Sequence, residues 1–267
     1  MRKLFREEAE EDGPFLPRDW AIIEMREREM VLDRIGIHEG ESVLEVGCGR
    51  HALTTIPLAM KVGREGRVVA VERERWSGFT GRIRAAGLEG RVLPVRCDAR
   101  KLPFADSTFD GVVCVHGFRS FPRRSEFVAA VREMLRVSRG PISIAESVPS
   151  PRNAAQRAHL AAYSLRWPTF VAAGRRDWGD VPYPGVAELR KLVATAGGRR
   201  ISVTTFDPGT TAHLARLPME DVRHHFLTKI KSIATRERLD SAWQVALKAI
   251  EVNGEEHLPV TVVSCRR

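Results

Sequence analysis

Short apolar strands that alternate with segments of helical length are the feature that most constrains the fold of this chain. Five such strands occur before residue 148 and read SVLEV, GRVVAVE, RVLPVRCD, FDGVVCVHG and GPISIAES. Segments of helical length lie between them, at 53–61, 76–86 and 125–137. Alternation at this spacing indicates βαβ units and a parallel sheet with helices on both faces. We therefore expect an α/β fold.

The remaining segments extend the same pattern less regularly. We expect a helix over 150–173, with Ser150 as N-cap and Pro151 at its first position. Another helix, VAELRKLVATA, precedes the strand RRISVTTFD, and LPVTVVSC is the last strand. Helical repeats predict three further apolar faces. They consist of Ile22, Met25, Met30, Leu32 and Ile35; of Met219, Val222, Phe226, Ile230 and Ile233; and of Trp243, Ala246, Leu247 and Ile250.

Composition indicates a globular protein of the cytoplasm. Hydrophobic residues make up 43% of the chain and charged residues 29%, and no apolar run approaches the roughly 20 residues of a membrane span. The acidic start MRKLFREEAEEDGPF does not resemble a signal peptide. The four cysteines form no CxxC pair, so we expect neither a disulfide framework nor a metal site. The net charge of +9 would attract phosphates, on RNA or on a small anionic substrate.

The stretch VLEVGCGRHALTT joins a strand, a glycine turn and a helix, an arrangement that binds nucleotides at the carboxyl edge of a sheet. GCGRHA also fits the dinucleotide pattern GxGxxG/A, which by itself is weak evidence. Glu45 stands two residues before Gly47, where its carboxylate would repel a pyrophosphate and favour a cation. S-adenosylmethionine is such a ligand, because it carries a sulfonium and an ammonium group and no phosphate.

Three motifs then resemble those of the class I S-adenosylmethionine-dependent methyltransferases. VLEVGCGRHALTTIPLA is similar to their first motif, VVAVE to the second strand with its terminal acid, and VRCDARKLPFADSTFDGVV to the third. The run LPFADSTFD is especially similar to the subgroup that contains the ubiquinone and menaquinone C-methyltransferases. The resemblance covers residues 41 to about 146 and implies a Rossmann-like, seven-stranded, mostly parallel sheet.

The resemblance implies S-adenosylmethionine as cofactor and S-adenosylhomocysteine as product. It implies that Glu72 holds the ribose hydroxyls, that Asp98 contacts the adenine amino group and that Ala99 offers its backbone to the ring. The full set implied to line the cofactor is Glu45, Gly47, Cys48, Gly49, His51, Glu72, Arg73, Asp98, Ala99 and Val115.

Cys48 and His51 are the two residues of the glycine turn with reactive side chains. We expect Cys48 to pack and not to act as a nucleophile, because no base is near it in sequence. His51 stands where the family usually has a third glycine. If that position requires a positive φ, a histidine would cost roughly 1 to 2 kcal/mol.

The acceptor side is less well defined. A general base is needed only if the acceptor loses a proton. His116, just after the fourth strand, is the best-placed candidate, and Tyr163 and Tyr183 are weaker ones. Arginines and aromatic residues alternate in GFRSFPRRSEF and LRWPTFVAAGRRDWG. They would suit an anionic or planar acceptor or RNA; alternatively the aromatic rings fill the core and the arginines face solvent. The candidate substrate-binding residues are Arg119, Tyr163, Trp167 and Tyr183.

The leading hypothesis is methyl transfer to a small, anionic or planar molecule. The fourth strand runs into VHGF and not into the Asn/Asp-Pro-Pro-Tyr turn of enzymes that methylate exocyclic or amide nitrogens. No Pro-Cys nucleophile follows this strand, which argues against pyrimidine C5 methylation. The alternatives are an RNA methyltransferase, which salt-dependent RNA retention would reveal, a non-catalytic methyltransferase-like subunit, and more distantly an NAD oxidoreductase. The pattern sets no oligomeric state.

We expect one domain over 1–267 with no internal repeat. Its parts are an N-terminal helical segment at 1–40, a cofactor-binding half at 41–147, a lid insertion at 148–184, and a C-terminal half at 185–267 with a helical insertion at 212–252.

Overall fold

The computed structural model describes residues 18–73, 76, 78–174, 182–212, 223 and 226–267. A seven-stranded sheet with the order β3-β2-β1-β4-β5-β7-β6 runs through it. All seven strands expected from the sequence are present. They are β1 (Ser42–Val46), β2 (Arg67–Glu72), β3 (Val92–Arg96), β4 (Gly111–Val115), β5 (Ile142–Ser147), β6 (Arg199–Phe206) and β7 (Val260–Arg266).

The sheet is mostly parallel, as predicted. Strands β3, β2, β1, β4 and β5 pair in parallel, whereas β7 is antiparallel to both of its neighbours, β5 and β6. The order in which strands are added to the sheet reverses at β1. Strands β2 and β3 lie on one side of β1, and β4 and β5 lie on the other. Such a reversal point is where open α/β sheets bind ligands, beyond the carboxyl ends of the strands.

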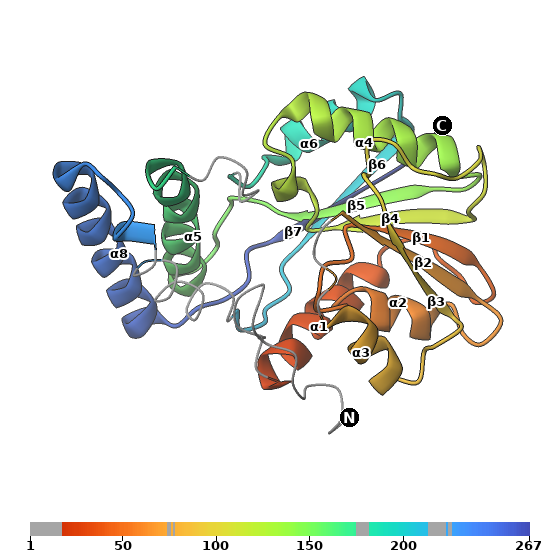
Figure 1. Cartoon of the computed structure of the whole chain (residues 1–267), viewed down its shortest axis with the longest axis horizontal. Coiled ribbons are helices and arrows are strands. Elements are labelled where there is room, and N and C mark those ends of the chain that lie inside the picture. The colour runs from red at the N-terminus through yellow and green to blue at the C-terminus, as the bar shows by residue number, and fades with distance from the viewer. Residues whose placement is uncertain (1–17, 74–75, 77, 175–181, 213–222, 224–225) are drawn as a thin grey trace.

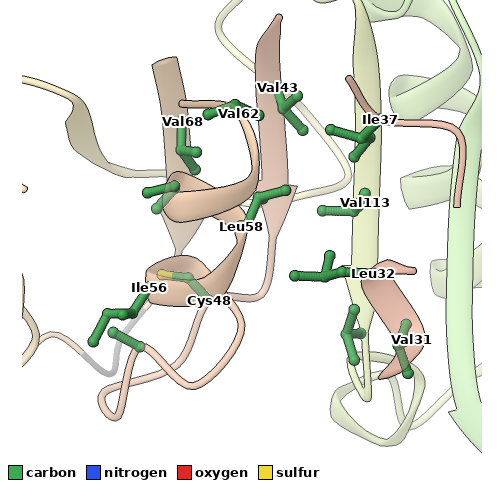
Figure 2. Close-up of a cluster of buried hydrophobic side chains, with 14 of the residues drawn as sticks. Val31, Leu32, Ile37, Val43, Cys48, Ile56, Leu58, Val62, Val68 and Val113 are labelled. Atoms are coloured by element: carbon green, nitrogen blue, oxygen red, sulfur yellow. The ribbon is translucent and has the colours of Figure 1, made fainter. Parts of the chain in front are cut away.

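Helices cover both faces of the sheet (Figure 1). On one face lie α1 (Arg18–Leu32), α2 (Thr55–Lys61) and α3 (Phe79–Ala85), and on the other α4 (Arg124–Val137) and α6 (Val186–Thr195). Side chains alternate between the two layers because successive strand residues point to opposite faces. Val43 packs with α1 and α2, for example, and Leu44 packs with α4. Figure 2 shows the first cluster, in which strand valines meet Leu58 of α2 and Leu32 of α1.

A pair of helices stands apart from these layers. The long helices α5 (Ala154–Ala172) and α8 (Ile233–Asn253) pack side by side around Trp243, whose indole nitrogen donates to the Thr169 hydroxyl (Figure 1). The predicted face of α8 is confirmed, because Trp243, Ala246 and Ile250 are buried and Leu247 is partly buried. None of the described helices is long and apolar enough to cross a membrane.

Several predicted helix starts were wrong, each for a local reason. The long helix begins after Asn153 and not after Ser150, because the Asn153 side chain accepts the amide hydrogen bond of Gln156. Helix α3 begins at Phe79 and not at residue 76, since Gly78 before it has a φ of +75°. Helix α2 begins at Thr55 and not at residue 53, after a turn in which Ala52 has a φ of +50°.

Two predicted apolar faces need correction. Phe226 and Ile230 are buried, but Ile233 is 61% exposed, because it begins α8 directly after the N-cap Ser232; Met219 and Val222 lie outside the described residues. The N-terminal helix ends at Leu32, short of Ile35, although Ile35 is buried in the core as predicted. Leu32 is buried, while Ile22, Met25 and Met30 are only partly buried.

Candidate functional site

The glycine turn after β1 begins the site. Gly47 has a φ of +79° and Gly49 a φ of +60°, conformations that favour glycine, and α2 begins a few residues later. The third positive φ of this turn belongs to Ala52 and not to His51. The strain considered for His51 therefore falls on its neighbour. His51 is half-buried, and its carbonyl accepts a hydrogen bond from Arg82 at 3.0 Å.

Two carboxylates lie beside this turn. Glu72 ends β2, and its side chain accepts hydrogen bonds from the amides of Gly49 at 3.3 Å and Arg73 at 2.8 Å. Glu45 of β1 is buried, and its Oε2 makes no hydrogen bond with the described residues. Burial, and then the charge of Glu72, raise the pKa of Glu45 to about 7. A buried carboxylate in this condition is stabilised in its charged form by a nearby cation.

Cys48 packs between these groups, as expected. It belongs to the core cluster of α2 and β1 (Figure 2), and burial followed by the charges of Glu45 and Glu72 holds the pKa of its thiol far above the ordinary range. A thiol in this state is not a nucleophile at neutral pH.

The third strand adds Asp98 to the same edge. The amide of Cys97 donates to the carbonyl of Glu72, so the segment after β3 lies next to the end of β2. Arg100 engages both carboxylate oxygens of Asp98 and also binds Glu126 of α4 at 2.9 Å. These hydrogen bonds lower the pKa of Asp98. Ala99 is half-buried, and Arg73 is exposed with its carbonyl bound by Arg96.

The end of β4 carries an unusual backbone. Val115 is buried, and His116 has a φ of +54°, which few residues other than glycine adopt. A Cβ on Gly117 would lie 2.4 Å from the Cys114 sulfur, so only glycine fits there. A Cβ on Gly47 would meet the Gly117 Cα at 3.9 Å, which places the end of β4 against the glycine turn.

His116 is enclosed by two carboxylates from different elements. Its Nε2 lies 3.1 Å from Glu27 of α1, and its Nδ1 lies 3.7 Å from Glu146 of β5. Burial alone would lower the pKa of His116, but these two carboxylates outweigh it and raise the pKa above its usual value. The geometry therefore favours an imidazolium that joins α1 to the sheet.

The charged face of α1 continues this network. Arg28 binds Glu24 at 2.7 Å and Glu27 at 2.6 Å, and Glu24 lies 3.1 Å from His257, which precedes β7. All these side chains are buried. Burial would raise the pKa of Glu24, but His257 and then Arg28 lower it to about 2.

A second cluster lies on α5 and its neighbours. His159 lies 2.8 Å from Glu255 through Nδ1 and 3.3 Å from the Tyr183 hydroxyl through Nε2. The rings of Tyr163 and Tyr183 are stacked with centroids 4.0 Å apart. Trp167, the other aromatic candidate, packs against the core on the α4 side of the sheet. The structure thus brings Tyr163 and Tyr183 together.

The arginines of the two stretches GFRSFPRRSEF and LRWPTFVAAGRRDWG differ in their surroundings. Arg124 lies 2.6 Å from Glu188 of α6, and Arg119 is half-buried in the short 3₁₀ helix Phe118–Ser120. Arg175, Arg176 and Trp178 lie outside the described residues.

Sequence reasoning missed the residues that join these clusters. They are Glu24, Glu27, Arg28, Glu146, Glu255 and His257, and His159 was assigned only to a helix. Glu146 could have been found by the rule that identified Glu72, because both are acids near the end of a parallel strand. No sequence pattern predicts that the acids of α1 are buried, because charged side chains are rarely buried.

The residues at the glycine turn fit S-adenosylmethionine. The orphaned oxygen of Glu45 and the carboxylate of Glu72 can receive a cation and hydroxyl groups, and Gly47 and Gly49 allow close backbone approach. No group of three or more metal-ligating side chains occurs within the part of the chain that the structure describes.

Comparisons with known proteins agree with this geometry. A methyltransferase domain family model matches residues 43–140. The demethylmenaquinone methyltransferase of Staphylococcus aureus (strain JH9) is 27% identical over 195 residues, which cover 69% of this chain and 79% of that protein.

Two solved structures share the fold. A cyclopropane-fatty-acyl-phospholipid synthase-like protein from Lactobacillus casei ATCC 334 has a TM-score of 0.76 at 20% identity, covering 96% of this chain and 95% of that one. Phosphoethanolamine N-methyltransferase 2 of Haemonchus contortus, solved with S-adenosyl-L-methionine, has a TM-score of 0.53 at 14% identity, covering 90% of this chain and 52% of that one. Motifs, fold and relatives agree: residues 43–140 match a methyltransferase domain, and the chain is an S-adenosylmethionine-dependent methyltransferase similar in sequence to the demethylmenaquinone methyltransferases.

Proposed function

We propose that this enzyme methylates a small planar molecule that binds beyond the carboxyl ends of β4 and β5. The observation that carries the proposal is the glycine turn with Glu45 and Glu72 beside it, next to the strained end of β4. A cofactor held by the turn would present its reacting group toward β4, the strand that flanks β1 at the reversal point.

The chain's own residues would mainly bind and orient. When bound, S-adenosylmethionine supplies an electrophilic methyl group on a sulfonium sulfur. In our proposal, Glu45 faces its positive charge, Glu72 accepts hydrogen bonds from the ribose hydroxyls, and Asp98 accepts one from the adenine amino group. Ala99 and Val115 line the ring and the reacting end. His116 serves to hold α1 over the site, because both of its ring nitrogens face carboxylates.

Two observations favour a planar acceptor over an anionic one. Tyr163 and Tyr183 form a stacked aromatic pair on the acceptor side, and the Staphylococcus aureus relative is named for a quinone acceptor, demethylmenaquinone.

Calorimetric titration with S-adenosylmethionine and S-adenosylhomocysteine tests the cofactor site. We expect the wild type to bind both. Glu72→Ala should bind about 10- to 100-fold more weakly, the loss expected for hydrogen bonds to a charged group. Asp98→Ala should lose less, since Arg100 already shares that carboxylate. Glu89→Ala, an exposed acid between α3 and β3, is the matched control and should bind as the wild type does.

Two results would refute the proposed site. One is a wild type that binds neither compound. The other is a pair of variants, Glu72→Ala and Asp98→Ala, that both bind as tightly as Glu89→Ala.

A further inference from the structure

We propose that Tyr183, His159 and Glu255 form a proton relay that removes a proton from the methyl acceptor. This inference deepens the proposed function and rests on it. It assigns catalysis to residues on α5, on the segment before α6 and on the segment before β7.

The hydrogen-bond geometry sets the direction of the relay. The Glu255 carboxylate, which can only accept, lies 2.8 Å from His159 Nδ1, so Nδ1 carries the ring proton. The lone pair of Nε2 then faces the Tyr183 hydroxyl oxygen at 3.3 Å, and the hydroxyl donates to it. His159 is 4% exposed and Glu255 6%, whereas Tyr183 is half-buried. The relay therefore leads from an accessible phenol to a buried base.

The relay stands at the edge of the sheet where the cofactor site lies. Helix α5 follows β5, and Glu255 precedes β7, whose first residue Val260 pairs with Ser147 at the end of β5. The His159 and His257 rings have centroids 6.4 Å apart. From His257, the buried contacts of α1 lead to the end of β4.

His159 is better suited to accept a proton than His116. Each ring nitrogen of His116 faces a carboxylate, which stabilises the protonated ring. His159 faces one carboxylate and one phenol. The rings of Tyr163 and His257 also lie near it, and Arg166 lies over Tyr163. This is the pattern of a base oriented by an acid behind it.

The step balances as follows. The acceptor atom forms a bond to the methyl carbon while the carbon–sulfur bond breaks and its electron pair stays on sulfur. The acceptor's proton passes to Tyr183 Oη as the Tyr183 proton passes to His159 Nε2. Glu255 stabilises the resulting imidazolium. Such a relay serves only acceptors that lose a proton, which selects a hydroxyl or an acidic C–H over a tertiary amine or a thioether.

The test uses 1,4-dihydroxynaphthalene as a planar probe and methyl-labelled S-adenosylmethionine. In single turnovers, Tyr183→Phe should be about 10-fold slower and His159→Gln about 100-fold slower or more. All variants should bind S-adenosylhomocysteine within twofold of the wild type. His38→Gln, an exposed histidine before β1, is the matched control and should react at the wild-type rate.

A second readout does not need the acceptor. Nitrogen-15 NMR of labelled histidine, assigned by the signal missing in His159→Gln, should show the ring proton of His159 on Nδ1, as the contact with Glu255 requires. A ring proton on Nε2, or wild-type rates in both Tyr183→Phe and His159→Gln, would overturn the relay. Absence of S-adenosylhomocysteine binding by the wild type would instead refute the proposed function. Binding without methylation of the probe would refute its planar acceptor, while the NMR result would still decide the relay.

Discussion

At the residue scale, the end of β4 shows how much the site depends on single positions. His116 has a positive φ, which costs a residue other than glycine on the order of 1–3 kcal/mol, and Gly117 has no room for a side chain. The conformation aims the Phe118 amide at Glu146 and the His116 ring between two acids. These contacts with Glu146 and Glu27 therefore offset the backbone strain, and the contact with Glu27 also fixes α1.

Single acids at strand ends could be predicted because their spacing is regular. Glu45, Glu72 and Asp98 follow the strands by rule, and the structure places them along one edge. The sequence could not show that His51 avoids a positive φ. That depends on how the turn enters α2, where Ala52 adopts the positive φ instead.

Glu45 should make cofactor binding depend on pH. Its pKa of about 7 means that bringing a cation beside it favours the charged form and releases a proton. Affinity for S-adenosylmethionine should therefore rise with pH through 7, by at most about tenfold per pH unit below that value. Calorimetry from pH 6 to 8, in buffers that differ in ionisation enthalpy, measures both effects.

Glu45→Gln is the control for this prediction and should bind with little dependence on pH. S-adenosylhomocysteine, which lacks the sulfonium charge, should show a shallower slope than S-adenosylmethionine. Equal slopes for the wild type and Glu45→Gln would show that another group is responsible.

At the element scale, α1 is the clearest departure from sequence expectation. Its repeat predicted an apolar face, but the residues most deeply buried include Glu24, Glu27 and Arg28. A pattern that counts hydrophobic residues cannot find such a face, because each charge is tolerated only through partners distant in sequence, such as His116 and His257. The start of α5 was misplaced for a smaller reason, since Asn153 and Ser150 are both good caps and only the fold selects between them.

Removing a carboxylate from α1 should destabilise the protein in a pH-dependent way. Glu24→Gln should lower the free energy of unfolding at pH 7 by about 3–5 kcal/mol, because it leaves a buried ion pair broken. The pKa of Glu24 is about 2 in the fold and 4.5 ordinarily. Its stabilisation is therefore complete above pH 4.5 and is lost as pH falls towards 2. Urea unfolding at several pH values should show the two proteins converging in acid.

Glu29→Gln, on the exposed side of the same helix, is the control and should unfold within about 0.5 kcal/mol of the wild type. If Glu24→Gln matched it at pH 7, the ion pairs of α1 would contribute little to stability.

At the scale of the whole molecule, strands and layers were predictable and lateral order was not. Each strand could be predicted from its apolar run. Parallel pairing could be predicted from the helical segments that lie between successive strands. Nothing in the run LPVTVVSC says that it lies between β5 and β6. That placement comes from the packing of the completed sheet. The association with RNA suggested by the net charge of +9 stays a prediction.

The position of β7 has a consequence for how the chain is made. It follows the other six described strands in sequence, yet it is the neighbour through which β6 joins the sheet. During synthesis, one edge each of β5 and β6 stays unpaired until residues 260–266 emerge. Unpaired strand edges can pair with strands of other chains. A nascent chain stalled before Val260 should therefore aggregate or bind chaperones, as pelleting assays would measure, whereas one from which residues 260–266 have emerged should not. The sheet can close between β5 and β6 only after β7 has been made.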